Sequence, residues 1–219
     1  MNPVICIDGP SGAGKGTVSR CLAQRLGFTI LDSGALYRLT ALSAQLAGVD
    51  INDQSAVAAL ARHMDVCFLA QGDGTQVLLE GQDVTRAIRE ESVGTTASIV
   101  AAYPSVRSSL LERQRAFAQA PGLIADGRDM GTVVFPVAPL KVFLTASAQS
   151  RAARRVLQLQ QMGVEADLSV ITSDIEARDL RDATRSEAPL VAASDALVID
   201  STALTVDQVV EQILARWNP

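Results

Sequence analysis

Residues 4–17 read V-I-C-I-D-G-P-S-G-A-G-K-G-T, a short apolar run followed by a glycine-rich loop. The β-branched run at residues 4–7 predicts a buried strand, and the apolar spacing of residues 17–26 predicts a helix after the loop. Between them, residues 9–15 fit the pattern G-x-x-x-x-G-K, in which glycines let backbone N–H groups point at an anion. The stretch therefore predicts a strand–loop–helix unit that binds the phosphates of a nucleotide.

The residue types in the loop indicate how it would bind a nucleotide. Lys15 supplies a mobile cation for the outer phosphates, and the following helix adds the positive end of its dipole. Gly16 stands where the common pattern has Ser or Thr, and the hydroxyl comes one position later, at Thr17. We expect Thr17 to contact the metal, directly or through water, with Asp126 as the other candidate. The expected nucleotide-binding residues are Gly9, Pro10, Ser11, Gly12, Ala13, Gly14, Lys15, Gly16 and Thr17.

Outward from the loop, short apolar strands alternate with helices, which favours a parallel sheet covered on both faces. Further strands are predicted at residues 28–31, 123–125, 142–144 and 196–199. Helices are predicted at residues 35–47, 53–63, 91–102, 104–119, 147–162, 168–185 and 206–217. Apolar runs at 66–69 and 76–79 flank Gly72-Asp73-Gly74 and predict a β-hairpin within an insert at about residues 65–90.

Composition narrows the class of protein. The 219 residues are 48% hydrophobic and 20% charged, which is typical of a folded globular chain. The net charge of −5 disfavours a nucleic-acid partner, because general nucleic-acid binders are more often basic. The three cysteines are scattered, and neither a secretory segment nor an apolar run of about 18 residues is present. We therefore expect a cytoplasmic protein with reduced thiols and no membrane partner. Because no sequence pattern indicates a buried dimer face, we also expect a monomer.

Other users of a phosphate loop fit less well. A GTPase needs an Asn/Thr-Lys-x-Asp clamp, and Lys141, the only lysine besides Lys15, lies between Leu140 and Val142. Motor and helicase ATPases need an acidic pair to position water, whereas residues 124–127 offer a lone Asp126. Transfer to a bound acceptor is therefore favoured. A kinase for UMP, shikimate or a coenzyme precursor, a non-catalytic nucleotide-binding regulator and a nucleic-acid-binding ATPase stay open as alternatives.

Three stretches are candidate acceptor sites. Residues 32–38, D-S-G-A-L-Y-R, put Ser33 at a helix N-terminus, with Arg38 about one turn further; a plain helix cap and a solvated arginine are the alternative. Residues 126–132, D-G-R-D-M-G-T, follow a buried strand at its carboxyl end, where open parallel sheets bind ligands. There Arg128 can grip a phosphate bidentately, and Asp129 can order a sugar hydroxyl or metal-bound water. The predicted helices at residues 147–162 and 168–185 carry charged side chains at helical spacing, which suggests a lid that closes over phosphates. These side chains are Arg151, Arg154, Arg155, Arg178, Asp182 and Arg185.

Taken together, residues 9–17, 32–38, 126–132 and the R-D-x-x-D stretch at 178–182 resemble the bacterial cytidylate kinases, which are nucleoside monophosphate kinases. The likeness spans nearly the whole chain. It implies a single α/β P-loop kinase domain over residues 1–219, with a five-stranded parallel sheet flanked by helices. The core would comprise residues 1–34, 105–146 and 186–219, the monophosphate-binding insert about 35–104 with its hairpin at about 65–84, and the lid about 147–185.

The same resemblance implies transfer of the γ-phosphoryl group of ATP to CMP or dCMP, with Mg²⁺ as cofactor. It assigns Ser33, Arg38 and Arg128 to the phosphate of the acceptor, Ser98, Arg107 and Arg185 to cytosine, and Asp129, Arg178 and Asp182 to the ribose. The expected catalytic residues are Lys15, Arg128, Asp129, Arg151 and Arg155. A phosphate monoester is mostly a dianion at pH 7, so no general base is required. The preference among CMP, dCMP and UMP stays open.

Overall fold

The computed structural model describes residues 2–71, 74–161 and 163–218. Two compact units make up the chain, one from residues 1–32 and 115–219 and the other from residues 33–114. Within the described ranges, no helix is long and apolar enough to cross a membrane.

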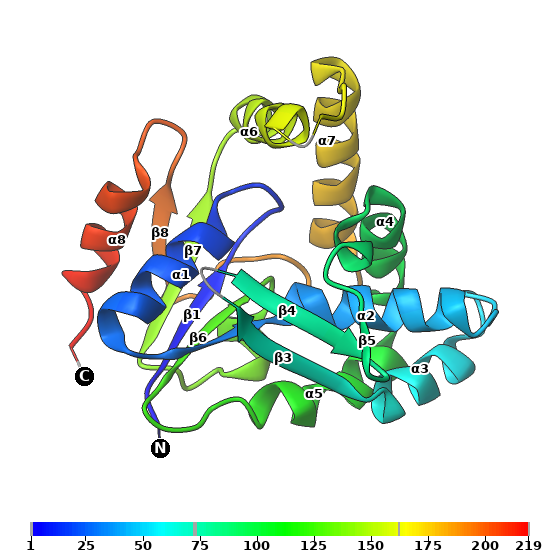
Figure 1. Ribbon diagram of the computed structural model, residues 1–219. Helices are drawn as coiled ribbons and strands as arrows, with labels where there is room; N and C mark the ends of the chain where they lie inside the picture. Colours follow the sequence, from blue (N-terminus) through cyan, green and yellow to red (C-terminus); the bar gives the residue numbers. More distant parts are fainter. Residues whose placement is uncertain (1, 72–73, 162, 219) are drawn as a thin grey trace. The chain divides into compact units, whose positions relative to one another are not determined.

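Five parallel strands form the sheet of the first unit, as the sequence predicts (Figure 1). In chain order they are β1 (Val4–Asp8), β2 (Thr29–Asp32), β6 (Leu123–Gly127), β7 (Leu140–Thr145) and β8 (Leu197–Asp200). Their order in the sheet is β2-β6-β1-β7-β8, so β1 is central and the register pairs Asp8 with Gly127 of β6. Every residue of β1 and β6 is buried, which explains why both read as continuous apolar runs. The residues after these two strands therefore meet at one edge of the sheet.

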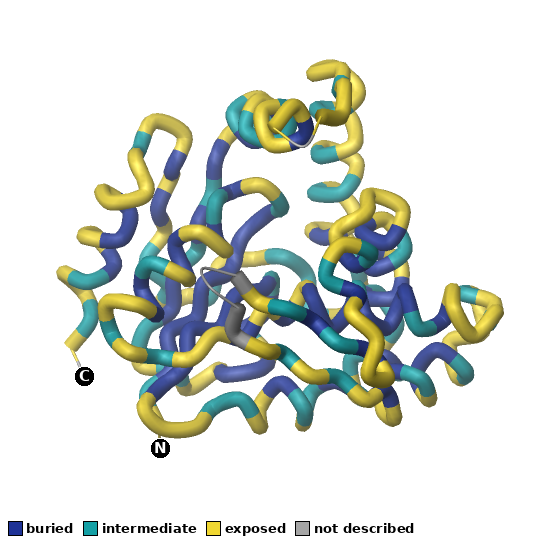
Figure 2. The backbone as a smooth tube through the Cα atoms, in the orientation of Figure 1, coloured by how far each residue is buried: buried dark blue, intermediate teal, exposed yellow. Residues whose placement is uncertain are grey.

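Helices α1 (Lys15–Leu26) and α8 (Val206–Leu214) pack against the sheet. Val18 and Leu22 of α1 join Val210 and Ile213 of α8 in one cluster with buried side chains of the strands. Figure 2 colours the buried stretches of the backbone dark blue. Two more helices, α6 (Ala148–Gln161) and α7 (Leu168–Thr184), follow β7 and pack against each other (Figure 1). A short π-helical turn, η2 (Met130–Val134), follows β6.

The second unit contains helices α2 (Ser33–Leu46), α3 (Gln54–His63), α4 (Glu91–Val100) and α5 (Pro104–Arg115), and the short helix η1 (Ala87–Arg89). Its antiparallel sheet is formed by β3 (Val66–Gln71), β4 (Gly74–Leu79) and the short β5 (Gln82–Asp83). The predicted hairpin strands are confirmed, with Val66 paired to Leu79 and Leu69 to Gln76. The expected turn residues Gly72 and Asp73 lie outside the described residues.

The boundary of this unit differs from the expected insert of residues 35–104. The unit extends from residue 33 to residue 114 and so includes nearly all of α5. Arg113 of α5 donates a hydrogen bond to the backbone oxygen of Met64 at 2.9 Å, and Ser105 donates to that of Gln54 at 3.3 Å. These bonds attach α5 to the helices and hairpin of the insert. The helix also ends at Arg115, four residues before the predicted end at 119.

Candidate active site

The phosphate loop connects β1 to α1 and depends on glycine at defined points. Gly9, Gly12 and Gly14 have φ angles of 148°, 78° and 93°, which other residues rarely adopt. A Cβ atom on Gly9 would also lie 1.9 Å from the backbone oxygen of Leu144 in β7. The loop can therefore follow this path, which turns back toward the start of α1, only with glycine at position 9.

Lys15 is the first residue of α1 and is buried. Its Nζ atom donates to the backbone oxygen of Pro10 at 3.0 Å and lies 3.8 Å from Oδ1 of Asp126. Burial, reinforced by the positive charge of Arg128, lowers the pKa of Lys15 to about 8. Burial likewise raises the pKa of Asp126 to about 7, although Lys15 opposes that change. The carboxylate compensates the buried ammonium only in part, so a polyphosphate here would stabilise the charged form of Lys15.

Two arginines of α6 support the phosphate loop. Arg151 donates to the backbone oxygen of Ser11 at 3.0 Å and to that of Ala146 at 2.9 Å, and its Nη2 atom contacts Asp179 at 2.5 Å. Arg154 donates to the backbone oxygens of Ala13 at 3.5 Å and of Ser201 at 2.7 Å. Carbonyl acceptors of the loop are thereby satisfied, and α6 is joined to the loop. Arg155 instead donates to Gln158 on the same helix at 3.4 Å.

The second predicted motif, residues 126–132, lies beside the C-terminal part of α7. Arg128 donates through Nε to Oδ2 of Asp182 at 2.9 Å, and Nη2 of Arg185 lies 3.9 Å from Oδ1 of Asp129. The structure thus brings four predicted substrate-binding residues together as two neighbouring ion pairs. Arg178 lies on α7 one turn before Asp182, while Arg185 follows the end of the helix instead of being part of it.

Asp8 is a buried carboxylate next to the phosphate loop that sequence reasoning did not single out. It ends β1, is 5% exposed, and accepts hydrogen bonds from the backbone N–H groups of Met130 and Gly131, each at 2.8 Å. Burial raises the pKa of Asp8 to about 6, although both N–H bonds oppose that change. A single carboxylate ending an otherwise apolar strand, directly before the glycine loop, is the signal that could have identified it.

The raised pKa of Asp8 predicts a pH effect on stability. Because the folded chain holds the proton more tightly than the unfolded chain, Asp8 stabilises the fold below pH 4, and this contribution is lost as the pH rises through 6. Relative to an Asp8→Asn variant, the free energy of unfolding of the wild type should fall by up to about 3 kcal/mol between pH 4 and pH 7. Urea denaturation of both proteins between pH 4 and pH 7 measures this difference. If the free energies of unfolding of the two proteins change with pH in parallel, the raised pKa of Asp8 is contradicted.

In the second unit, Ser33 and Arg38 lie on α2, as predicted. Ser33 is the first residue of the helix, and its hydroxyl donates to Oε1 of Gln114 at 2.7 Å. Arg38 donates to the backbone oxygen of Ile88 at 2.7 Å. A Cβ atom on Gly94 of α4 would lie 2.9 Å from the guanidinium of Arg38, so glycine there leaves room for it. Gly94 is a second residue that the sequence did not single out.

Ser98 and Arg107 belong to the same unit, on α4 and α5. The Ser98 hydroxyl is buried and has no hydrogen-bond partner among the described residues, which suits a side chain that binds a ligand. Arg107 donates to the backbone oxygen of Ala101 at 3.2 Å, and its guanidinium carbon lies 5.8 Å from the centre of the Tyr37 ring. This cation–π contact fixes the direction of the side chain.

Oxygen donors near the start of α1 fit a magnesium ion that arrives with a nucleotide. Magnesium is usually held by one or two carboxylates together with substrate phosphates. A Cβ atom on Gly16 would lie 3.6 Å from Oδ2 of Asp126, so this carboxylate faces the turn that carries Thr17. The Thr17 hydroxyl accepts a hydrogen bond from Arg20 at 3.2 Å. The described part of the chain contains no cluster of three His, Cys, Asp or Glu residues that could hold a metal without such phosphates.

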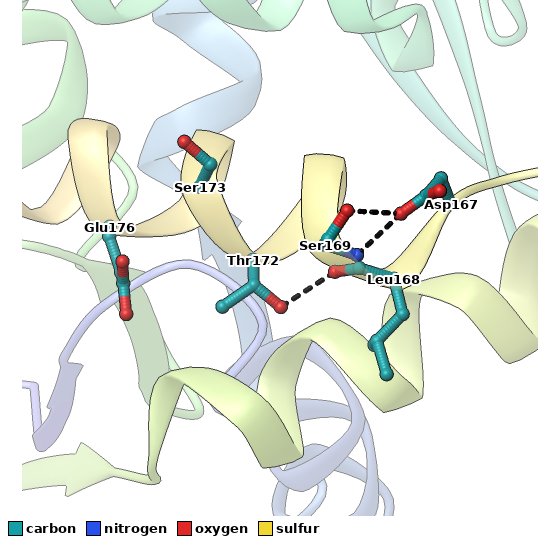
Figure 3. A pocket seen from close by; sticks show the side chains of 6 residues that line it. All are labelled: Asp167, Leu168, Ser169, Thr172, Ser173 and Glu176. Atoms are coloured by element: carbon teal, nitrogen blue, oxygen red, sulfur yellow. Dashed lines mark hydrogen bonds between the residues drawn. The ribbon is translucent and has the colours of Figure 1, made fainter.

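An open cavity of about 680 Å³ borders the N-terminal half of α7 (Figure 3). Its lining contains two carboxylates and no cationic side chain, and none of the predicted site residues. Asp167 caps the helix by accepting hydrogen bonds from the backbone N–H groups of Ser169 at 2.7 Å and Val170 at 3.3 Å. The carboxylates explain why this cavity does not suit phosphate.

A phosphate loop on a five-stranded parallel sheet, with an arginine-bearing loop after the adjacent strand, defines a phosphate-loop kinase. The family model for cytidylate kinase matches residues 5–218, and the chain therefore belongs to the cytidylate kinase family. This confirms the resemblance that its motifs indicated.

Individual comparisons agree with this membership. A cytidylate kinase of Saccharophagus degradans is 59% identical over 215 residues, which cover 98% of this chain and 96% of the relative. One of Yersinia pestis is 57% identical over 213 residues, covering 97% and 93%. Among solved structures, an uncharacterized protein from Eubacterium ventriosum shares the fold, with a TM-score of 0.50, 12% identity and coverage of 98% and 97%.

Proposed function

We propose that this chain transfers the γ-phosphoryl group of ATP to CMP or dCMP, giving ADP and CDP or dCDP. The observation that carries the proposal is the pairing of Asp8 with Gly127 at the ends of adjacent strands. It places the start of the phosphate loop beside the start of the Arg128–Asp129 motif. Membership of the cytidylate kinase family supports a cytidine nucleotide as acceptor. Formation of CDP from ATP and CMP by the purified chain is the direct test.

The phosphate loop and Lys15 are the proposed site for the ATP phosphates. Glycines 9, 12 and 14 free the backbone N–H groups to face an anion, and α1 begins directly behind them. Lys15 would follow the transferring phosphoryl group with its ammonium. When bound, Mg²⁺ neutralises phosphate oxygens, and Thr17 and Asp126 are the residues that would hold it.

Acceptor binding is assigned to the residues that the family resemblance indicates. Arg128 would exchange its partner Asp182 for the phosphate of CMP, which leaves the Asp182 carboxylate for a ribose hydroxyl. Ser33 and Arg38 would also contact the phosphate, and Asp129 and Arg178 the ribose. For the base, three side chains are assigned: Ser98, Arg107 and Arg185. The buried hydroxyl of Ser98, which has no partner among the described side chains and backbone, supports its place in this set.

Catalysis then rests on charge and position. The nucleophile is a phosphate oxygen that is already ionised at neutral pH, so the obstacle is bringing two polyanions together. In a chain of net charge −5, positive charge must be concentrated locally, which Lys15, Arg128, Arg151 and Arg155 would do. Helices α6 and α7 would close as a lid and exclude water, which limits wasteful hydrolysis of ATP. We propose a monomer that works in the cytoplasm.

Replacing Arg185 by Ala tests the base-reading assignment. KM for CMP should rise roughly ten- to hundredfold, since a charged hydrogen-bond donor is lost, and the preference for CMP over AMP should shrink by a similar factor. KM for ATP should stay nearly constant. Arg181→Ala is a matched control, because Arg181 is an exposed arginine in the last turn of α7, the helix that ends just before Arg185. An equal loss for all acceptors would rule out base reading by Arg185.

A further inference from the structure

The turn η2 is held at both ends by charged side chains from other elements. At its start, the Asp8 carboxylate accepts the N–H groups of Met130 and Gly131, one on each oxygen. At its end, Arg115 donates through Nε to the backbone oxygen of Val134 at 3.1 Å and through Nη2 to that of Val133 at 3.5 Å. The negative charge of Asp8 thus lies at the N–H groups that begin the turn, and the positive charge of Arg115 lies at the carbonyls that end it. This is the favourable arrangement of charges for a helical turn.

These contacts also restrict what Asp8 can do. Each of its carboxylate oxygens accepts one backbone N–H group, and the side chain is 5% exposed. The burial of Asp8 therefore gives the carboxylate little access to solvent or to a mobile ion beside the phosphate loop. Its backbone belongs to the central strand, paired on one side with β6 and on the other with β7, so the carboxylate has a rigid support.

The residues just before η2 are the ones assigned to the acceptor. Asp129 immediately precedes the turn and Arg128 comes one residue earlier. Charge-assisted hydrogen bonds are about twice as strong as neutral ones, so the pair of bonds from Asp8 fixes the direction in which the chain leaves Asp129. A loop without this restraint would present Arg128 and Asp129 in several orientations, and misplacement by about 1 Å can cost two orders of magnitude in rate.

We infer that Asp8 and Arg115 are positioning residues, which hold η2 at its two ends and so orient Arg128 and Asp129 toward the acceptor phosphate and ribose. The inference rests on the proposed function, because it concerns the acceptor half of that reaction. Neither residue is among those assigned to a substrate. Asp8 additionally links the two halves of the site, since it ends the strand from which the phosphate loop begins.

Steady-state kinetics of Asp8→Ala, Asp8→Asn and Arg115→Met test the inference, with ATP and CMP varied separately at pH 8. For Asp8→Ala we expect KM for CMP to rise, and kcat to fall, at least tenfold each, while KM for ATP changes less than threefold. Asp8→Asn should recover part of the loss, because its amide oxygen can accept one of the two bonds. Arg115→Met should change the same constants in the same direction. Ile5→Val is the control for a structural loss in β1, and all of its constants should stay at wild-type values.

Amide hydrogen exchange of the substrate-free proteins supplies a readout that does not depend on activity. Protection at Met130 and Gly131 should fall at least tenfold in Asp8→Ala and stay unchanged in Ile5→Val. If the wild type forms CDP but Asp8→Ala leaves KM for CMP and this protection unchanged, or raises only KM for ATP, the inference is wrong. If the wild type forms no CDP while η2 loses protection in Asp8→Ala, the proposed function fails and the restraint on η2 stands.

Discussion

Replacement of Lys15 by Ala is expected to lower turnover by a factor of order 10²–10³ or more, as for other electrostatic stabilisers of a transition state. The ammonium is held in a buried site by the backbone oxygen of Pro10 and lies near Asp126. Its removal takes away the cation that we propose follows the transferring phosphoryl group, so the stabilisation of developing charge is lost. Steady-state CDP formation at saturating ATP and CMP measures the effect.

The matched control for Lys15 is another cation on the same helix. Arg25 lies in the last turn of α1, is partly exposed, and pairs with Asp207 and Glu211. Arg25→Ala changes the net charge as Lys15→Ala does, but the ion pairs of Arg25 are exposed and far from the phosphate loop in the sequence of the helix, so its turnover should equal that of the wild type. Full turnover in Lys15→Ala, or an equal loss in both variants, would contradict the role of Lys15 at the transferring group.

Gly9→Ala is expected to be the most destabilising single substitution in the phosphate loop. The added Cβ atom would lie 1.9 Å from the backbone oxygen of Leu144, which belongs to a central strand and cannot move aside alone. The backbone at Gly9, with φ of 148°, is also strained for any other residue. We expect a loss of about 4 kcal/mol or more in the free energy of unfolding, and loss of ATP binding in any protein that remains folded.

Gly27→Ala separates the two causes of that loss. Gly27 ends α1 with a φ of 69°, but a Cβ atom there would meet nothing within 4 Å. Only backbone strain remains, so the cost should be about 1 kcal/mol with ATP binding intact. Urea denaturation and calorimetric titration with ATP compare the two variants. Similar losses of stability in both would show that the contact with Leu144 is unimportant.

The phosphate loop and the parallel strands could be predicted because their signals are local. Residues 4–7 and 9–17 specify a buried strand, a turn and a helix start within fourteen positions, and β1 and α1 follow from them. The sequence singled out Arg128 and Asp182 separately, each within a motif, but did not predict that they pair across 54 positions. Their direct contact depends on how α7 packs, which no local pattern records.

The hydrogen-bond partners of Asp8 could not be predicted, because they are backbone N–H groups 122 and 123 positions away. Backbone donors leave no mark in the side-chain sequence, so only the fold shows them. The same reason applies to α5. Its attachment to the insert depends on Arg113 reaching the carbonyl of Met64, and a spacing rule for helices does not contain that contact.

Nucleoside diphosphate formation from Mg·ATP across CMP, dCMP, UMP, AMP, GMP and shikimate tests the central claim most directly. Rapid formation of CDP and dCDP, with little product from the purine nucleotides or shikimate, is the predicted result; the rate with UMP then maps the remaining pyrimidine preference. Bound ATP with no transfer to CMP or dCMP, or faster transfer to a purine nucleotide or shikimate, would contradict the proposed acceptor.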